Sequence, residues 1–219
     1  FGFPLRFPPI IIYMDAPGMR EELRDMARRL GTVGYYVMLP NLYYRTGREG
    51  EYGYDLAKIR IDDAEREKMF QVMRTLTNAA VVSDTQPLLT YACNDDASTQ
   101  GPFGCIGYCM GGRHVFCAAG HFPETFRASA SLHGTALITD EANSPHLLSA
   151  KFRGELYCGY GENDRFTPPT LVKKMEELFR TSPVEYCYEV HAGADHGYAL
   201  PDRDIFDARA AARDWEIFF

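Results

Sequence analysis

The sequence predicts an α/β fold in which a mostly parallel central sheet is covered by helices on both faces. Short runs of β-branched and aromatic residues alternate along the chain with longer segments whose apolar residues recur at helical spacing. The first such run, a helical segment and the next run follow one another within about 30 residues, as in a strand–helix–strand unit. Strands separated by helices pair in parallel and the helices cover the sheet, so this pattern predicts the fold class.

The first half of the chain begins this alternation. Residues 9–14 (PIIIYM) form a continuous apolar run, typical of a strand buried on both faces. Apolar residues then recur at helical spacing over 19–30, and two glycines end that helix before a second strand at 35–40. Residues 41–53 are rich in Gly, Tyr and Arg and predict a loop. The helices expected next lie at 55–78, as one helix or two, and at 86–92.

The second half continues the same pattern. The expected elements are, in chain order, a strand at 103–108, a helix at 110–119, a strand at 128–133, a polar loop at 135–150, a strand at 156–160, a proline-opened helix at 167–179, a strand at 184–190 and a helix at 204–218. No repeat or linker interrupts the series, so residues 1–219 predict a single domain. The chain enters a strand soon after Phe1 without an initiator Met, and we expect a further edge segment, such as a hairpin, before it.

Composition limits the function classes. Hydrophobic residues make up 46% of the 219 residues and charged residues 24%, which is typical of a globular protein. The formal net charge is −7, and an acidic surface repels phosphate backbones, which argues against a nucleic-acid partner. No apolar run reaches the roughly 20 residues that span a membrane, and no signal-peptide pattern is visible. We therefore expect a cytoplasmic monomer or homodimer that acts on a small molecule.

Six cysteines raise the question of disulfides or a metal site. A chain of this length does not need disulfide bonds for stability, so reduced thiols are expected. Cys105, Cys109, His114 and Cys117 are close in sequence, but they span a predicted strand, a turn and a helix, so their side chains should diverge. The sequence therefore predicts neither a metal nor a cofactor.

The strongest chemical motif is the segment 107–112 (GYCMGG), which lies between a predicted strand and a predicted helix. Glycines on both sides of Cys109 permit a tight turn that lifts its side chain clear of the sheet. The positive end of the following helix favours a thiolate, and the amide of Met110 would face a developing oxyanion. A buried, inert cysteine is the alternative, but the flanking glycines favour a nucleophile.

A nucleophilic cysteine needs a base, and the base needs an orienting group. His196 directly follows the last predicted strand and is the candidate base, with His191 as its competitor. Asp164 follows the strand at 156–160 and is the candidate acid, with Glu162 and Asp195 as competitors. The order nucleophile, acid, histidine along the chain is the order expected of α/β-hydrolases.

Four segments together resemble the dienelactone hydrolase family. They are MDAPGMREELRDMARRLGTVGYYVMLPNLYYR (14–45), GYCMGGR (107–113), GENDRFTPP (161–169) and GADHGYALP (193–201), which between them span most of the chain. The resemblance implies an α/β-hydrolase fold without a large lid. It also implies hydrolysis of esters and lactones by a Cys-Asp-His triad, which by position is Cys109, Asp164 and His196.

The resemblance assigns further residues by position. Asp15 matches an acidic residue that lies near the resting cysteine in the family, and Ala16 would supply a second oxyanion amide beside that of Met110. The alternative for Asp15 is a carboxylate that stabilises a helix N-terminus. Arg66 matches an arginine that holds the substrate carboxylate.

One position departs from the family pattern. The second arginine of the archetype falls at Leu200, and this difference argues against dienelactone itself as the substrate. Arg203, Arg45 and Arg165 are possible substitutes, although surface arginines are usually solvated. Six tyrosines between residues 35 and 54 are expected to serve mainly in packing, with a pocket wall as the alternative.

The function predicted from these residues is hydrolysis of a small carboxylic ester or lactone through an acyl-thioester. Two other classes of protein remain as alternatives. Glutamine-amidotransferase-like proteins also carry a cysteine in a G-x-C-x-G turn, but their histidine is followed closely by a glutamate that is lacking after His196. A non-catalytic ligand-binding member of the same fold is the other alternative, and a thioester or peptide substrate also fits the motifs.

Overall fold

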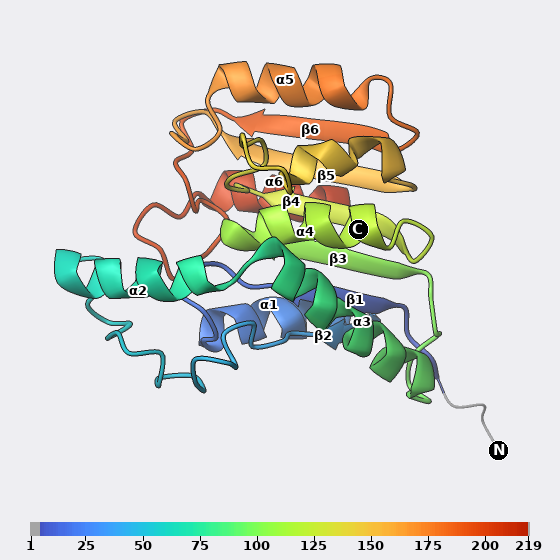
Figure 1. Ribbon diagram of the computed structural model, residues 1–219, viewed down its shortest axis with the longest axis horizontal. Coiled ribbons are helices and arrows are strands. Elements are labelled where there is room, and N and C mark those ends of the chain that lie inside the picture. The colour runs from blue at the N-terminus through green and yellow to red at the C-terminus, as the bar shows by residue number, and fades with distance from the viewer. Residues whose placement is uncertain (1–4, 219) are drawn as a thin grey trace.

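The computed structural model describes residues 5–218, apart from the side chain of Phe218. Within this range six strands form one sheet in the order β2-β1-β3-β4-β5-β6, and every neighbouring pair is parallel (Figure 1). The strands are β1 (Pro9–Tyr13), β2 (Tyr36–Met38), β3 (Phe103–Tyr108), β4 (Phe126–Leu132), β5 (Glu155–Gly161) and β6 (Glu185–His191). The predicted α/β class with a parallel sheet is confirmed, whereas the segment expected before Phe1 lies outside the described residues.

Helices cover both faces of the sheet, as two tyrosines show. Tyr13 on β1 hydrogen-bonds Thr85 in α3 (Asn78–Asn94), and Tyr157 on β5 hydrogen-bonds Asp214 in α6 (Ala208–Phe218). The strand register aligns Tyr13 with the same face as Cys158, the residue next to Tyr157. Successive strand residues point to opposite faces, so α3 and α6 lie on opposite sides of the sheet.

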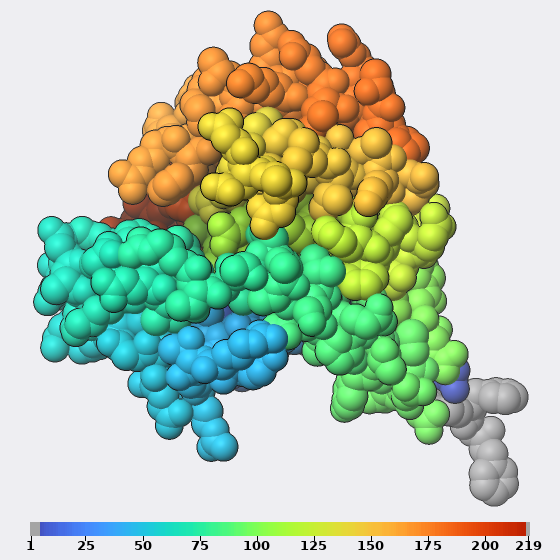
Figure 2. All heavy atoms as spheres, viewed as in Figure 1, coloured from blue at the N-terminus to red at the C-terminus, as the bar shows by residue number. Residues whose placement is uncertain are grey.

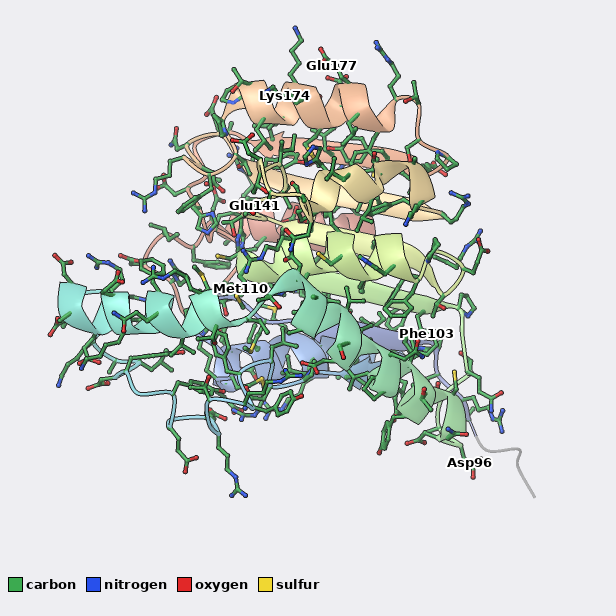
Figure 3. All side chains as sticks on the ribbon, in the orientation of Figure 1. Asp96, Phe103, Met110, Glu141, Lys174 and Glu177 are labelled. Carbon is green, nitrogen blue, oxygen red and sulfur yellow. The ribbon has the colours of Figure 1, made fainter. Side chains whose placement is uncertain are left out.

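The other helices are amphipathic and pack with their apolar sides inward. They are α1 (Glu21–Thr32), α2 (Asp63–Thr75), α4 (Met110–His121) and α5 (Pro169–Phe179), together with a 3₁₀ segment η1 (Pro145–Lys151). On α5, Val172 and Met175 are buried, whereas Lys174 and Glu177 project away from the sheet (Figure 3). Helix α4 is the exception because it is buried almost throughout, in the centre of the molecule.

Three segments differ from the sequence expectation. The helix expected at 86–92 begins much earlier, at Asn78, because the Thr77 hydroxyl caps it by accepting the Ala80 amide. Pro87 lies inside this helix and suggests an interruption that the structure does not have. Helix α2 begins at Asp63 rather than at 55, since the Asp62 side chain caps its first turn.

The third difference is η1, which occupies part of the expected polar loop at 135–150. Helix α2 and the segment before it project as a lobe at one side of the molecule (Figure 2). Among residues 5–218, none of the helices combines the length and apolar content that crossing a bilayer requires.

Candidate active site

Cys109 occupies a strained turn between β3 and α4. Its backbone has φ 54° and ψ −114°, a conformation that side-chain-bearing residues rarely adopt. The flanking glycines are required sterically: a Cβ on Gly107 would lie 2.1 Å from the Gly111 carbonyl oxygen, and one on Gly111 would lie 2.0 Å from the Tyr13 carbonyl oxygen. The turn therefore forms because its glycines let two backbones pass closely, and it presents Cys109 at the start of α4.

The structure brings the three predicted triad residues together. The Nε2 atom of His196 lies 3.1 Å from Sγ of Cys109, and its Nδ1 atom lies 2.8 Å from Oδ2 of Asp164. The other oxygen of Asp164 accepts the amide of Phe166 at 2.8 Å, so both carboxylate oxygens are fixed. The aspartate side chain is fully buried, and that of His196 is 17% exposed.

Electrostatics at His196 favour its charged form. Burial alone would lower its pKa, but the Cys109 sulfur and the Asp164 carboxylate outweigh burial and raise the pKa to about 10. The aromatic ring of Phe166 packs edge-on against the imidazole, with 4.7 Å between ring centroids. The histidine is thus held on three sides by sulfur, carboxylate and ring.

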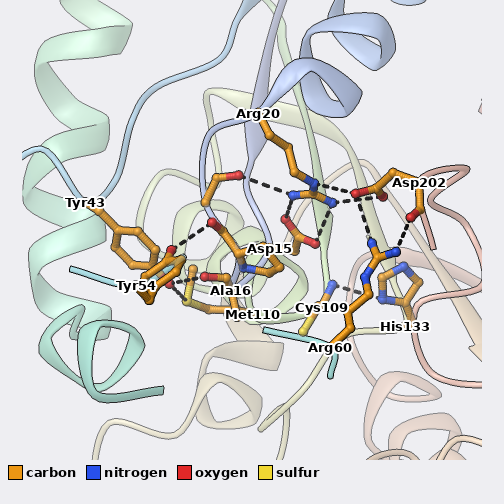
Figure 4. Close-up of polar contacts among 12 residues, drawn as sticks. Asp15, Ala16, Arg20, Tyr43, Tyr54, Arg60, Cys109, Met110, His133 and Asp202 are labelled. Atoms are coloured by element: carbon orange, nitrogen blue, oxygen red, sulfur yellow. Dashed lines mark hydrogen bonds and ion pairs between the residues drawn. The ribbon is translucent and has the colours of Figure 1, made fainter. Parts of the chain in front are cut away.

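The two predicted oxyanion residues border the same turn. Met110 opens α4, so its amide has no carbonyl one turn earlier to bind. Ala16 lies in a turn in which the Gly18 amide binds the Asp15 carbonyl, and among residues 5–218 its own amide donates no hydrogen bond. Tyr43 holds this arrangement, because its hydroxyl donates to the Ala16 carbonyl at 2.9 Å and lies 3.6 Å from Sδ of Met110 (Figure 4).

Asp15 is engaged elsewhere. Both of its oxygens accept hydrogen bonds from the Arg20 guanidinium, at 2.5 and 3.0 Å, and its side chain is fully buried. Arg20 also binds Asp202 at 2.8 Å, and Arg60 binds Asp202 from the other side (Figure 4). Within the described chain Asp15 has no hydrogen bond to Cys109, so its predicted role near the thiol gains no support from these contacts.

Arg66 is not brought to the triad. It lies on α2 and pairs with Asp63, one turn earlier in the same helix, with 39% of its side chain exposed. Of the suggested substitutes, Arg45 pairs with Asp84 at 2.6 Å, and Arg165 lies over the ring of Phe166. The Nε atom of Arg203 is buried and has no hydrogen-bond partner within residues 5–218.

The competing histidine and acids have other partners. His191 binds Asp214 through Nε2 at 2.8 Å and does not contact Cys109 among the interactions of the described chain. Glu162 accepts the amide of Gly193 from an exposed position, and Asp195 is also exposed. The geometry therefore favours His196 and Asp164 as the partners of the thiol.

Sequence reasoning missed three residues around the site: His133, Tyr43 as a support of Ala16, and Arg20. His133 is the last residue of a predicted strand, so its place at the carboxyl edge of the sheet was a usable signal. Nothing local marks the contacts of Tyr43 and Arg20, because their partners lie on other segments of the chain.

Two cavities lie away from the triad, toward the end of the sheet marked by Phe103, which Figure 3 shows opposite Met110. One of them, of about 460 Å³, is lined by residues such as Ile10, Ala128 and Tyr157. Neither cavity is lined by Cys109, His196 or Asp164, so neither bears on the chemistry of the triad.

Comparison with known proteins gives one consistent result. The sequence matches the "Dienelactone hydrolase family" over residues 3–219. A protein of Synechocystis named "Putative carboxymethylenebutenolidase" is 28% identical over 214 residues, which cover 96% of this chain and 83% of that one. The "Carboxymethylenebutenolidase" of Rhodococcus opacus is 22% identical over 211 residues, covering 94% of this chain and 77% of that one.

Among solved structures, one titled "Putative Dienelactone Hydrolase" from Klebsiella pneumoniae superposes with a TM-score of 0.84. It is 23% identical and covers 98% of this chain and 85% of its own. At that identity the superposition shows a shared fold.

Proposed function

Because the chain belongs to the dienelactone hydrolase family, we propose that it hydrolyses small carboxylic esters or lactones with Cys109 as the nucleophile. One observation carries the proposal: Sγ of Cys109, the imidazole of His196 and the carboxylate of Asp164 form a continuous hydrogen-bonded series, with separations of 3.1 and 2.8 Å. Such a series is what an activated thiol requires.

Acylation begins at the thiol. With the proton of Cys109 already on His196, the thiolate sulfur attacks the carbonyl carbon of the ester, forming a carbon–sulfur bond and a tetrahedral oxyanion. When this intermediate collapses, the carbon–oxygen bond to the alcohol breaks and His196 gives its proton to the leaving alkoxide. A lactone follows the same step, except that the alcohol stays attached to the acyl group.

In deacylation, water attacks the thioester carbon and the sulfur is the leaving group. His196 takes a proton from water, and the resulting hydroxide attacks the thioester carbon. Collapse breaks the carbon–sulfur bond, releases the carboxylic acid and restores the thiolate, with the proton on His196. Asp164 accepts a hydrogen bond from the Nδ1–H group throughout, so it holds the imidazole with Nε2 facing the sulfur.

The amides of Met110 and Ala16 are the proposed oxyanion donors. Each such donor typically lowers the barrier by roughly 3 kcal/mol. Tyr43 supports both residues, and Pro17 limits the freedom of the Ala16 turn. Since Leu200 is fully buried and Arg66 pairs with Asp63, the contacts in hand favour neutral esters over dienelactone as substrates.

The test is turnover of p-nitrophenyl acetate and of a panel of esters, lactones and dienelactones by wild type and Cys109→Ala. We expect Cys109→Ala to lose turnover by at least about 10³-fold. Cys187→Ala is the matched control, because Cys187 is an exposed cysteine on β6, and it should keep wild-type rates. Turnover retained in Cys109→Ala would end the proposal.

The non-catalytic alternative makes a different forecast for the same panel. A binding protein would show ligands that protect Cys109 from iodoacetamide without any hydrolysis. The amidotransferase-like alternative receives no support, since the family match covers nearly the whole chain.

A further inference from the structure

A second histidine, His133, lies directly behind the Cys109 turn. It follows β4, and its amide binds the Gly159 carbonyl on the neighbouring strand at 2.8 Å. Its backbone has φ 38°, in the left-handed region, and its side chain is fully buried. A buried histidine with positive φ thus lies next to a nucleophile with positive φ, and residues held in this region cluster at functional sites.

His133 binds the nucleophile itself. The Cys109 amide donates to Nδ1 of His133 at 3.1 Å and shares its proton with the Leu132 carbonyl at 3.0 Å (Figure 4). A backbone amide can only donate, so Nδ1 must carry a lone pair, and the neutral ring then holds its proton on Nε2. The contact therefore favours one tautomer and one charge state, in which the proton on Nε2 is buried without a hydrogen-bond partner among residues 5–218.

The surroundings of His133 keep that state. The ring packs edge-on against His196 and Tyr198, with centroid separations of 5.2 and 5.4 Å, and lies 6.0 Å from the ring of Tyr108. Burial lowers the pKa of His133 well below its ordinary value, and the charges of His196 and Arg203 lower it further. A proton added to Nδ1 would break the bond to Cys109 and place two imidazolium rings edge to face.

We propose that His133 is a positioning residue: as a permanently neutral acceptor it fixes the Cys109 peptide so that the thiol stays directed at Nε2 of His196. This inference rests on the proposed role of Cys109 as the nucleophile. It also assigns all of the imidazolium charge in the site to His196, because the neighbouring ring cannot take a proton without losing its hydrogen bond.

Three substitutions separate the acceptor from packing and backbone strain. His133→Asn keeps an acceptor, since Oδ1 of Asn occupies nearly the place of Nδ1, and Asn tolerates positive φ well. His133→Leu introduces a side chain of nearly the same shape as that of the His133→Asn variant, but without an acceptor. His133→Phe keeps a ring for packing against His196 and also lacks the acceptor.

The measurement is the rate at which iodoacetamide alkylates Cys109, followed by mass spectrometry in a Cys93→Ser, Cys187→Ser background. The remaining cysteines, Cys105, Cys117 and Cys158, are buried, so alkylation in this background reports on Cys109. We expect His133→Leu and His133→Phe to slow alkylation by about tenfold, the usual effect of one lost hydrogen bond. His133→Asn should stay within about threefold of wild type. Ester turnover should fall in kcat with KM little changed.

Alkylation does not need turnover, so it separates this inference from the proposed function. If Cys109→Ala retained turnover, the proposed function would fail while the alkylation comparison could still be read. Wild-type alkylation and kcat in His133→Leu would overturn the positioning role. If His133→Leu and His133→Phe fail to fold, His133→Asn is the deciding variant, because a loss of tenfold or more in it would contradict a role that needs only an acceptor.

NMR of the His133 ring gives a second test, because a role in packing alone would not require one particular tautomer. The ¹⁵N shifts of the His133 ring should show a proton on Nε2 and none on Nδ1, unchanged between pH 5 and 9. Titration of this ring within that range would also refute the inference.

Discussion

Two histidine–aspartate pairs lie near the end of β6, and of these two the His196 pair contacts a nucleophile. His196 binds Asp164 and His191 binds Asp214, each at 2.8 Å, and the two histidines are five residues apart in the chain. The two hydrogen bonds are equal in length, but His196 uses Nδ1 and His191 uses Nε2, and the surroundings of the two pairs also differ.

The free nitrogen of His196 faces the Cys109 sulfur, and 17% of its side chain is exposed. The second pair is closed: His191 is 6% exposed and Asp214 only 1%. Asp214 also accepts the hydroxyls of Tyr157 and Tyr198 at 2.6 and 2.8 Å. The His196–Asp164 pair is a candidate for catalysis because it contacts an accessible sulfur. The His191–Asp214 pair is closed off by two tyrosine hydroxyls and contributes to packing.

The His191–Asp214 pair is also connected to the loop that carries His196. Tyr198 follows His196 by two residues, and its hydroxyl ties the histidine loop to Asp214 on α6. We infer that the second pair anchors the loop that carries the first. The predictions below compare the two pairs by substituting matched residues in each.

The largest contrast is expected between the two histidines. His196→Gln should lower kcat by about 10³-fold, in the range of lost general acid–base catalysis, with little change in the unfolding transition. His191→Gln should keep turnover within a fewfold but lower the free energy of unfolding by about 2–3 kcal/mol, because it breaks a buried network. Ester assays and urea unfolding of both variants measure this, and an inactive but stable His191→Gln would reverse the assignment.

The two aspartates should differ in the same direction. Asp164→Asn should lower kcat by about 10²–10⁴-fold, since an amide donor at Nδ1 favours the wrong tautomer of His196. Asp214→Asn should cost about 2–4 kcal/mol of stability, because two tyrosines and His191 lose their charged acceptor. Equal losses of activity in both variants would show that the pairs are not distinct in function.

A third comparison asks whether the buried ion pair between Arg20 and Asp15 contributes more to stability than an ion pair at the surface. Arg20→Gln leaves the fully buried Asp15 without its cation and should cost about 3–5 kcal/mol. The control is Arg24→Gln, which removes a half-exposed pair with Glu49 and should cost about 1 kcal/mol or less. Urea unfolding compares the two, and equal costs would mean that the Asp15 pair contributes no more than a surface pair.

The smallest expected effect concerns the charge of His196. The Cys109 sulfur is a principal cause of its raised pKa of about 10, so Cys109→Ser should move the pKa down toward the ordinary value. In wild type the ring should therefore stay protonated above pH 8, and in the variant it should release its proton at lower pH. Titration of the histidine ring protons by NMR measures both, and an unchanged pKa would show that Asp164 alone holds the charge.

Several features followed from the sequence by itself. Glycines around Cys109 permit a tight turn between a strand and a helix, and an apolar run such as 9–14 belongs in a buried strand, because local sterics and hydrophobic periodicity act within a few residues. These short-range rules gave the parallel α/β class and pointed to Cys109. They failed for α3, which begins at the Thr77 cap and continues through Pro87 with an apolar side buried against the rest of the protein.

Tertiary structure alone decided which side chains meet. His196 and Cys109 are 87 residues apart, and Arg20 binds Asp202, which is 182 residues away in the chain. No local pattern encodes such contacts, so the sequence could rank His196 above His191 only by position. It could place His133 at the carboxyl edge of the sheet but not its contact with the Cys109 amide. The physical reason is that burial and hydrogen bonding depend on which segments the folded sheet brings side by side.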